Sequence, residues 1–164
     1  MQAKLRVVAV GGTFDEFHKG HEALLLKAFE AGQHVKIGLC SENFVKRMNK
    51  PHVTAPYSQR LKDLETFLRQ NGLLKRAEIS RIDDPFGVTL SDRSLEGIIV
   101  SKETEHTALL INRKRMELQL PPLRIVVIDM IPSDNHVPVS TTRIRCGEID
   151  REGHLLGKQS RERG

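Results

Sequence analysis

The chain has 164 residues, 38% of them apolar and 29% charged, which is ordinary for one globular domain that buries about 70% of its unfolded surface. It contains no apolar run near the roughly 20 residues of a membrane helix, no secretory apolar segment at its start, and two cysteines that fit neither a disulfide framework nor a zinc site. Its net charge of +5 is spread along the chain and only 4% of its residues are aromatic, which favours a small polyanion such as a nucleoside triphosphate over nucleic acid. We therefore expect a cytoplasmic protein that binds neither nucleic acid nor a membrane.

Apolar periodicity and turn residues predict alternating strands and helices. The expected strands span residues 5–10, 35–40, 77–82, 98–100 and 124–131, and the expected helices span 23–31, 57–70 and 103–119, with a last short helix near Ser140. Gly32 is predicted to end the first helix, residues 41–56 form a polar stretch, and residues 83–87 form a turn. This order predicts a single Rossmann-like α/β domain over residues 1–156, with a five-stranded parallel sheet, helices on both faces, and a flexible tail at 157–164.

Residues 11–21, which read Gly-Gly-Thr-Phe-Asp-Glu-Phe-His-Lys-Gly-His, join the first strand to the first helix and predict a phosphate site. Glycines allow backbone N–H groups to approach an anion, and the start of a helix favours negative charge. His18 and His21 lie at i and i+3 there and can donate hydrogen bonds to phosphate oxygens. The segments after the second and fifth strands are expected at the same edge of the sheet, where ligands bind in parallel α/β folds.

Two patterns resemble the motifs of one enzyme superfamily. The Thr-Phe-Asp-x-x-His-x-Gly-His pattern at residues 13–21 is neither a Walker motif nor a dinucleotide motif, and it resembles the first motif of the superfamily that contains phosphopantetheine adenylyltransferases and cytidylyltransferases. Residues 139–145, Val-Ser-Thr-Thr-Arg-Ile-Arg, resemble its second motif, Ile-Ser-Ser-Thr-x-x-Arg. Hydroxyl groups at a helix start can donate to phosphate oxygens, and an arginine one turn later can bind phosphate with two hydrogen bonds.

The segments between these motifs resemble the archaeal and eukaryotic type of phosphopantetheine adenylyltransferase. They are Asp-Pro-Phe-Gly-x-Thr at residues 84–89, Val-Ser-Lys-Glu-Thr at 100–104, and Ile-Asn-x-x-Arg at 111–115. The bacterial type has an arginine-rich loop after the fourth strand, where this chain has Ser-Lys-Glu-Thr, so those arginines cannot be carried over.

This resemblance implies that the adenylyl group of ATP is transferred to 4'-phosphopantetheine, by in-line attack of the acceptor phosphate, to give dephospho-coenzyme A and pyrophosphate in coenzyme A biosynthesis. It also implies Mg²⁺, held mainly by phosphate oxygens and water, with no protein ligands of its own. Product dephospho-coenzyme A or coenzyme A is a further expected ligand. The alternatives are a nicotinamide mononucleotide adenylyltransferase or a cytidylyltransferase, and, from another class, a regulatory or RNA-binding module. The oligomeric state is open, with a monomer favoured.

The resemblance also implies roles for individual residues. His18 is expected to donate to the α-phosphate, Thr13 to position a phosphate, and Lys46, preferred over Lys50, to reach both phosphates as the third catalytic residue. The expected phosphate-binding residues are Gly12, Thr13, Phe14, His18, His21, Ser140, Thr141, Thr142 and Arg145. The expected substrate-binding residues are Lys50, Ser101, Glu103, Asn112 and Arg115.

Each of these assignments has a simpler structural alternative. The glycines could form a tight turn, the histidines could cap a helix or ligate a metal, and the hydroxyl residues could be an N-cap. Lys46 and Lys50 could lie in a solvated loop, and Asn112 and Arg115 could belong to the polar face of a helix. Asp15 is expected to be structural, with hydrogen bonds to the turn that presents His18, and not a catalytic base.

Overall fold

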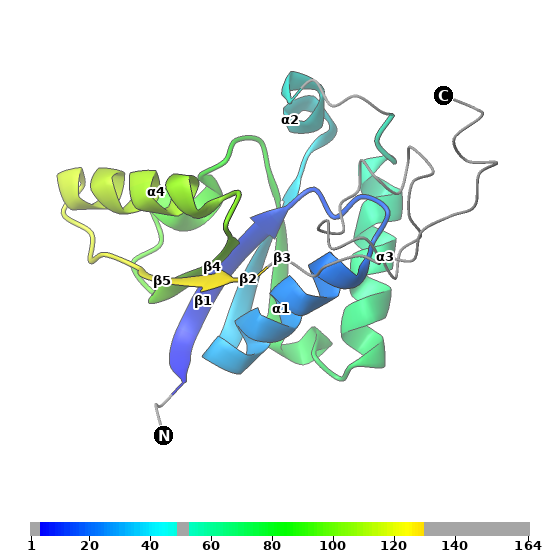
Figure 1. The fold of residues 1–164 in the computed structure, drawn as a ribbon, viewed down its shortest axis with the longest axis horizontal. Helices are drawn as coiled ribbons and strands as arrows, with labels where there is room; N and C mark the ends of the chain where they lie inside the picture. Colours follow the sequence, from blue (N-terminus) through cyan, green and yellow to red (C-terminus); the bar gives the residue numbers. More distant parts are fainter. Residues whose placement is uncertain (1–3, 49–52, 130–164) are drawn as a thin grey trace.

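The computed structural model describes residues 4–48 and 53–129. The elements are β1 (Leu5–Gly12), α1 (Lys19–Ala31), β2 (Gly32–Cys40), α2 (Glu42–Arg47), α3 (Tyr57–Gln70), η1 (Leu74–Arg76), β3 (Ala77–Ile82), η2 (Gly87–Leu90), β4 (Gly97–Ser101), α4 (Glu105–Glu117) and β5 (Arg124–Ile128). The five strands form one parallel sheet in the order β3-β2-β1-β4-β5 (Figure 1). The predicted α/β fold with a five-stranded parallel sheet is confirmed, and α3 and β3 have the predicted bounds.

Helices cover both faces of this sheet, as predicted (Figure 1). On one face α1 and α3 pack against alternate strand residues, and the core there contains Leu25 and Leu64, each 0% exposed. On the other face α4 packs through Ala108 and Ile111 against Ala9 and its neighbours on β4. Since successive strand residues point to opposite faces, the apolar runs in the strands supply both cores.

The first helix begins earlier than predicted and ends at Ala31 with Gly32 as its C-cap, as predicted. It begins at Lys19 because His18, an unusual N-cap residue, takes the capping position. Gly32 has extended backbone angles (φ −128°, ψ 149°) and is the first residue of β2, so the helix runs directly into the strand. A Cβ atom on Gly32 would lie 2.7 Å from a methyl group of the buried Val8, so close packing requires this glycine.

The predicted polar stretch after β2 contains a short helix, α2. Ser41 is its N-cap, and the Ser41 Oγ accepts a hydrogen bond from Phe44 N at 3.1 Å. The predicted turn at residues 83–87 is confirmed, since the Asp84 carboxylate accepts hydrogen bonds from two backbone N–H groups, those of Phe86 and Gly87. The predicted helix near Ser140 and the tail at 157–164 lie outside the described residues. Over the described ranges, no helix combines the length and apolar character needed to cross a membrane.

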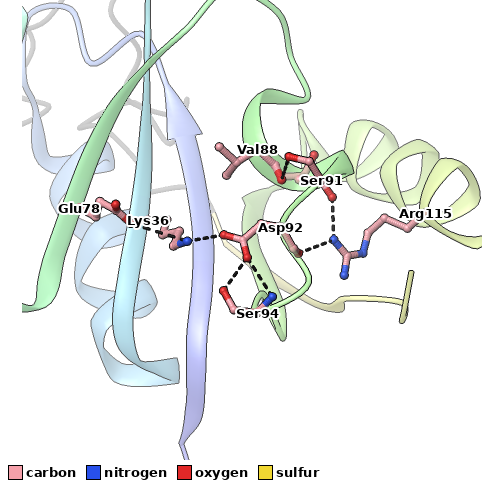
Figure 2. A network of polar contacts seen from close by, with 8 residues as sticks. Lys36, Glu78, Val88, Ser91, Asp92, Ser94 and Arg115 are labelled. Atoms are coloured by element: carbon pink, nitrogen blue, oxygen red, sulfur yellow. Dashed lines mark hydrogen bonds and ion pairs between the residues drawn. The ribbon is translucent and has the colours of Figure 1, made fainter. Parts of the chain in front are cut away.

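A polar network joins β2, β3, α4 and the segment before β4 (Figure 2). Lys36 on β2 donates a hydrogen bond to the Asp92 carboxylate and lies 3.7 Å from the Glu78 carboxylate. The Asp92 carboxylate also accepts from Ser94 N at 2.8 Å, while Arg115 donates to the Asp92 backbone carbonyl at 3.2 Å. The hydrogen bond to Asp92 raises the pKa of Lys36 above 10.5 against the opposing effect of burial. Burial alone would raise the pKa of Asp92, but the hydrogen bonds from Lys36 and Ser94 lower it below 3.8.

Replacing Lys36 with methionine is expected to lower the free energy of unfolding by about 1–3 kcal/mol at neutral pH, because a partly buried carboxylate loses its cation. The contribution of Asp92 is present above pH 3.8 and is lost as the pH falls through its lowered pKa. The contribution of Lys36 is present below pH 10.5 and is lost as the pH rises through its raised pKa. The free energy of unfolding, measured in urea from pH 3 to 11, should therefore differ most between wild type and variant near neutral pH, and less at both ends of this range.

Lys27→Met is the matched control, because the Lys27 side chain is 41% exposed and its partner in the ion pair within α1, Glu30, is 72% exposed. Its free energy of unfolding should stay near that of the wild type at every pH. An equal loss in both variants would contradict a stabilising role of the Lys36 network.

Candidate active site

A cavity of about 590 Å³ lies at the carboxyl ends of the strands. The ends of all five strands line it, together with residues at the starts of α1 and α4 and residues of α2. From the centre of the sheet, β1, β2 and β3 follow one another towards one edge, and β4 and β5 follow one another towards the other edge. The topology therefore reverses between β1 and β4. Such a switch point is where parallel α/β sheets bind ligands.

Two histidines at the start of α1 are held by a reciprocal capping arrangement. The Nδ1 atom of His18 accepts a hydrogen bond from Gly20 N at 3.1 Å, and the Nδ1 atom of His21 accepts one from His18 N at 3.2 Å. The two rings stack with their centroids 3.7 Å apart, and both side chains line the cavity. Because each Nδ1 accepts, the neutral rings carry their protons on Nε2, which makes Nε2–H the ring donor. The caps given as a structural alternative are therefore present, and the donor role of both histidines stays a prediction.

The connection between β1 and α1 contributes two of the predicted residues to the cavity. Gly12 and Thr13 both line it. Phe14 does not, because its side chain is 1% exposed and belongs to the hydrophobic core. Its buried side chain leaves only the Phe14 backbone for phosphate binding, and the phosphate role of this residue stays a prediction. A Cβ on Gly12 would approach the Phe14 ring to 3.2 Å, so the buried ring restricts what can replace that glycine.

The buried Asp15 lies between two residues with left-handed backbone angles. Phe14 has φ 52° and Glu16 has φ 48°, values that are unfavourable for residues other than glycine. Asp15 is 0% exposed, and its Oδ1 accepts a hydrogen bond from Ala55 N at 3.0 Å. This hydrogen bond gives Asp15 a structural role, as predicted, and joins the connection to the segment that precedes α3.

The preferred catalytic lysine is not among the residues that line the cavity. Lys46 is exposed on α2, whereas Phe44 of the same helix and the following Met48 line the cavity. Arg47, between them, donates a hydrogen bond to the Asp83 carbonyl. Lys50 lies outside the described residues, as do Ser140, Thr141, Thr142 and Arg145. The roles of these residues remain predictions.

The β4–α4 side supplies the other polar residues of the cavity. Ser101 and Glu103 line it, as predicted for substrate-binding residues. Thr104, Thr107 and Asp129 line it as well, and the sequence analysis did not single them out. The spacing of Thr104 and Thr107, three residues apart at a helix start, was the available signal for the two threonines. Within the described ranges, no three His, Cys, Asp or Glu side chains come together as metal ligands.

The other two predicted substrate-binding residues have structural partners. The Asn112 side chain exchanges two hydrogen bonds with the Leu123 backbone, at 2.7 and 2.9 Å. Arg115 is 0% exposed and donates to the carbonyls of Pro121 at 2.7 Å, Thr89 at 2.7 Å and Asp92 at 3.2 Å. Neither residue lines the cavity. Backbone groups occupy these side chains, which favours the structural alternative for both residues, and their substrate-binding role stays a prediction.

Comparison with known proteins agrees with this geometry. A family model for cytidylyltransferase-like proteins matches residues 9–147. The phosphopantetheine adenylyltransferase of Methanothermobacter thermautotrophicus is 46% identical over 158 residues, which are 95% of this chain and 93% of that protein. The phosphopantetheine adenylyltransferase of Pyrococcus abyssi is 48% identical over 158 residues, 95% of this chain and 99% of that protein. The chain belongs to the phosphopantetheine adenylyltransferase family.

The family resemblance expected from the two motifs is thus confirmed. The range matched by the cytidylyltransferase-like model includes the second motif at residues 139–145, which lies outside the described residues. Among solved structures, a protein of unknown function from Archaeoglobus fulgidus is 35% identical, with a TM-score of 0.67 over 74% of this chain and 88% of that chain. The solved structure therefore supports the fold, and the two named relatives support the family.

Proposed function

We propose that this chain transfers the adenylyl group of ATP to 4'-phosphopantetheine, giving dephospho-coenzyme A and pyrophosphate in coenzyme A biosynthesis. The names of its relatives support this activity over nicotinamide mononucleotide adenylyltransferase or cytidylyltransferase activity. The observation that carries the proposal is the stacked His18–His21 pair, whose capping bonds leave Nε2–H donors on residues that line the cavity. We also propose a cytoplasmic location, on the grounds given by the sequence, and a monomeric state.

The proposed reaction is a single in-line displacement at the α-phosphorus of ATP. A phosphate oxygen of the acceptor forms a bond to this phosphorus while the bond to the oxygen bridging to the β-phosphate breaks, and that oxygen leaves with pyrophosphate. No covalent enzyme intermediate is needed, because the acceptor is already anionic. Catalysis then depends on positioning and on stabilising the charge of the five-coordinate phosphorus.

The residues at the start of α1 have defined parts in this scheme. His18 donates from Nε2 to a non-bridging oxygen of the α-phosphate, and His21 donates to the triphosphate. Gly12 and Thr13 position the reacting phosphates, and the start of α1 adds a favourable field for negative charge. Lys46 is proposed to reach both reacting phosphates. The phosphates that leave as pyrophosphate are proposed to be held by Ser140, Thr141, Thr142 and Arg145.

Mg²⁺ is proposed to accompany ATP and to neutralise the triphosphate. The carboxylates that line the cavity, Glu103 and Asp129, are oxygen donors of the kind that this ion accepts, and they come from separate elements rather than from one cluster. This donor set fits an ion held mainly by phosphate oxygens and water.

The test is incubation of the protein with ATP and Mg²⁺ and, separately, with 4'-phosphopantetheine or nicotinamide mononucleotide, followed by measurement of pyrophosphate and mass identification of the product. A parallel reaction contains CTP and a phosphorylated alcohol. We expect dephospho-coenzyme A from 4'-phosphopantetheine and little product from the other acceptors. The absence of dephospho-coenzyme A, with product from another acceptor, would assign the chain to one of the alternatives.

A further inference from the structure

Arg60, in the first turn of α3, is a buried cation beside the cavity with no part in the scheme above. It is 1% exposed, and burial lowers the pKa of its guanidinium group. Burying a cation is unfavourable unless hydrogen bonds compensate for its lost hydration. An apolar side chain could fill the same space without that cost. The contacts of Arg60 therefore indicate why a guanidinium group is present.

The guanidinium of Arg60 donates to three backbone carbonyls from three separate segments. Its Nε lies 2.9 Å from the Ala55 oxygen, and its Nη1 lies 3.1 Å from the Thr13 oxygen and 2.7 Å from the Cys40 oxygen. Thr13 belongs to the connection between β1 and α1, Cys40 ends β2, and Ala55 precedes α3. Thr13 and Cys40 both line the cavity.

Along the chain, α2 lies between two of the residues whose carbonyls Arg60 contacts. Cys40 lies just before α2 and Ala55 lies after it, so one guanidinium group holds the chain on either side of the helix that carries Lys46. The third contact fixes the same guanidinium to Thr13. Asp15 adds a bond between the same two regions, because its carboxylate accepts from Ala55 N.

We infer that Arg60 is a positioning residue, which fixes the segment bearing α2 relative to the Thr13–His18 connection and so sets the geometry of the proposed adenylyl transfer. The inference rests on the proposed function for its catalytic consequence. A planar fork of donors is required, since a lysine ammonium group at the end of a flexible stem cannot reproduce three fixed directions. Displacement of reacting groups by about 1 Å can lower a rate by on the order of a hundredfold.

Arg76→Met is the matched control for Arg60→Met. Arg76 also donates to three backbone carbonyls, those of Gln33 at 2.9 Å, Phe29 at 2.7 Å and Gly32 at 2.9 Å, but these lie at the end of α1 and the start of β2, opposite the cavity. Both substitutions keep an unbranched stem and remove three hydrogen bonds, so a general loss of stability should affect both variants. Only the Arg60 substitution should disturb the site.

The experiment measures kcat and KM for ATP, per folded molecule and well below each variant's unfolding midpoint. We expect Arg60→Met to lower kcat by roughly ten- to a hundredfold with a smaller change in KM, and Arg60→Lys to give partial recovery. Arg76→Met should remain within about twofold of the wild type. Equal kcat values for the Arg60 and Arg76 variants would overturn the inference, whereas an inactive wild type would contradict the proposed function instead.

Limited proteolysis provides a readout that does not depend on turnover. Trypsin cuts after lysine and arginine, and Lys46 and Arg47 are both exposed on α2. Arg60→Met should accelerate the cuts after these two residues, identified by mass, while Arg76→Met should leave their rate unchanged. Unchanged cutting in the Arg60 variants would overturn the inference. Failure of both Arg60 variants to fold, with Arg76→Met folded, would also overturn it, because Arg60 would then be required for the fold as a whole.

Discussion

Replacement of His18 by asparagine is expected to lower kcat for adenylyl transfer by on the order of a hundredfold or more, while ATP still binds. The imidazole Nε2 donor disappears, but an asparagine side chain can still accept the hydrogen bond that Gly20 N donates to His18 in the structure. The start of α1 should therefore be retained. Steady-state kinetics and direct ATP binding by calorimetry measure the two effects separately.

His18→Ala is the companion variant, because it removes the donor and the helix cap together. Its free energy of unfolding should fall by about 1 kcal/mol relative to the asparagine variant, with a similar loss of kcat. If the asparagine variant kept wild-type turnover, or lost ATP binding with unchanged turnover per bound ATP, His18 would not be the donor to the transferring phosphate.

Replacement of Arg115 by methionine is expected to lower the free energy of unfolding by about 3 kcal/mol or more, because three backbone carbonyls lose the hydrogen bonds of a buried guanidinium group. These are the carbonyls of Thr89, Asp92 and Pro121, and the Arg115 side chain is 0% exposed. Urea unfolding followed by circular dichroism measures the change. Because Arg115 does not line the cavity, KM for either substrate should stay near the wild-type value for the folded fraction.

Arg113→Met is the control for this substitution, since Arg113 is exposed on the same helix. Its stability should change little. A raised KM for 4'-phosphopantetheine in the Arg115 variant, with stability intact, would restore the substrate-binding role that the sequence alone had suggested.

The parts of the fold that follow from local patterns were predicted well. The helical spacing at residues 57–70 and the apolar run at 77–82 coincide with α3 and β3. The start of α1 was missed because its N-cap is a histidine, whereas serine, threonine, aspartate and asparagine are the usual signals. Gly32 was expected to end the helix by its backbone freedom, but its role comes from its contact with Val8 across the sheet, which no local pattern contains.

The candidate site was predicted best where a single segment contains both the residues that shape the turn and the side chains that can bind phosphate. Gly12, Thr13, His18 and His21 fall in a single motif, and all four line the cavity. The structural contacts of Asn112 and Arg115 could not be predicted, because their hydrogen-bond partners are backbone groups, which leave no mark in the sequence. The role of Arg60 could not be predicted from the sequence for the same reason, since its three acceptors are carbonyls of distant residues.

Two arginines from the chain between β2 and β3 donate hydrogen bonds to the two ends of strand β2. Arg60 holds the carbonyl of Cys40, its last residue, and Arg76 holds the carbonyls of Gly32 and Gln33, its first two. Sliding of the strand along its own axis would break bonds at one end or the other. We therefore expect β2 to keep its position when a ligand binds, and any adjustment to the ligand to involve the helices and side chains around the cavity.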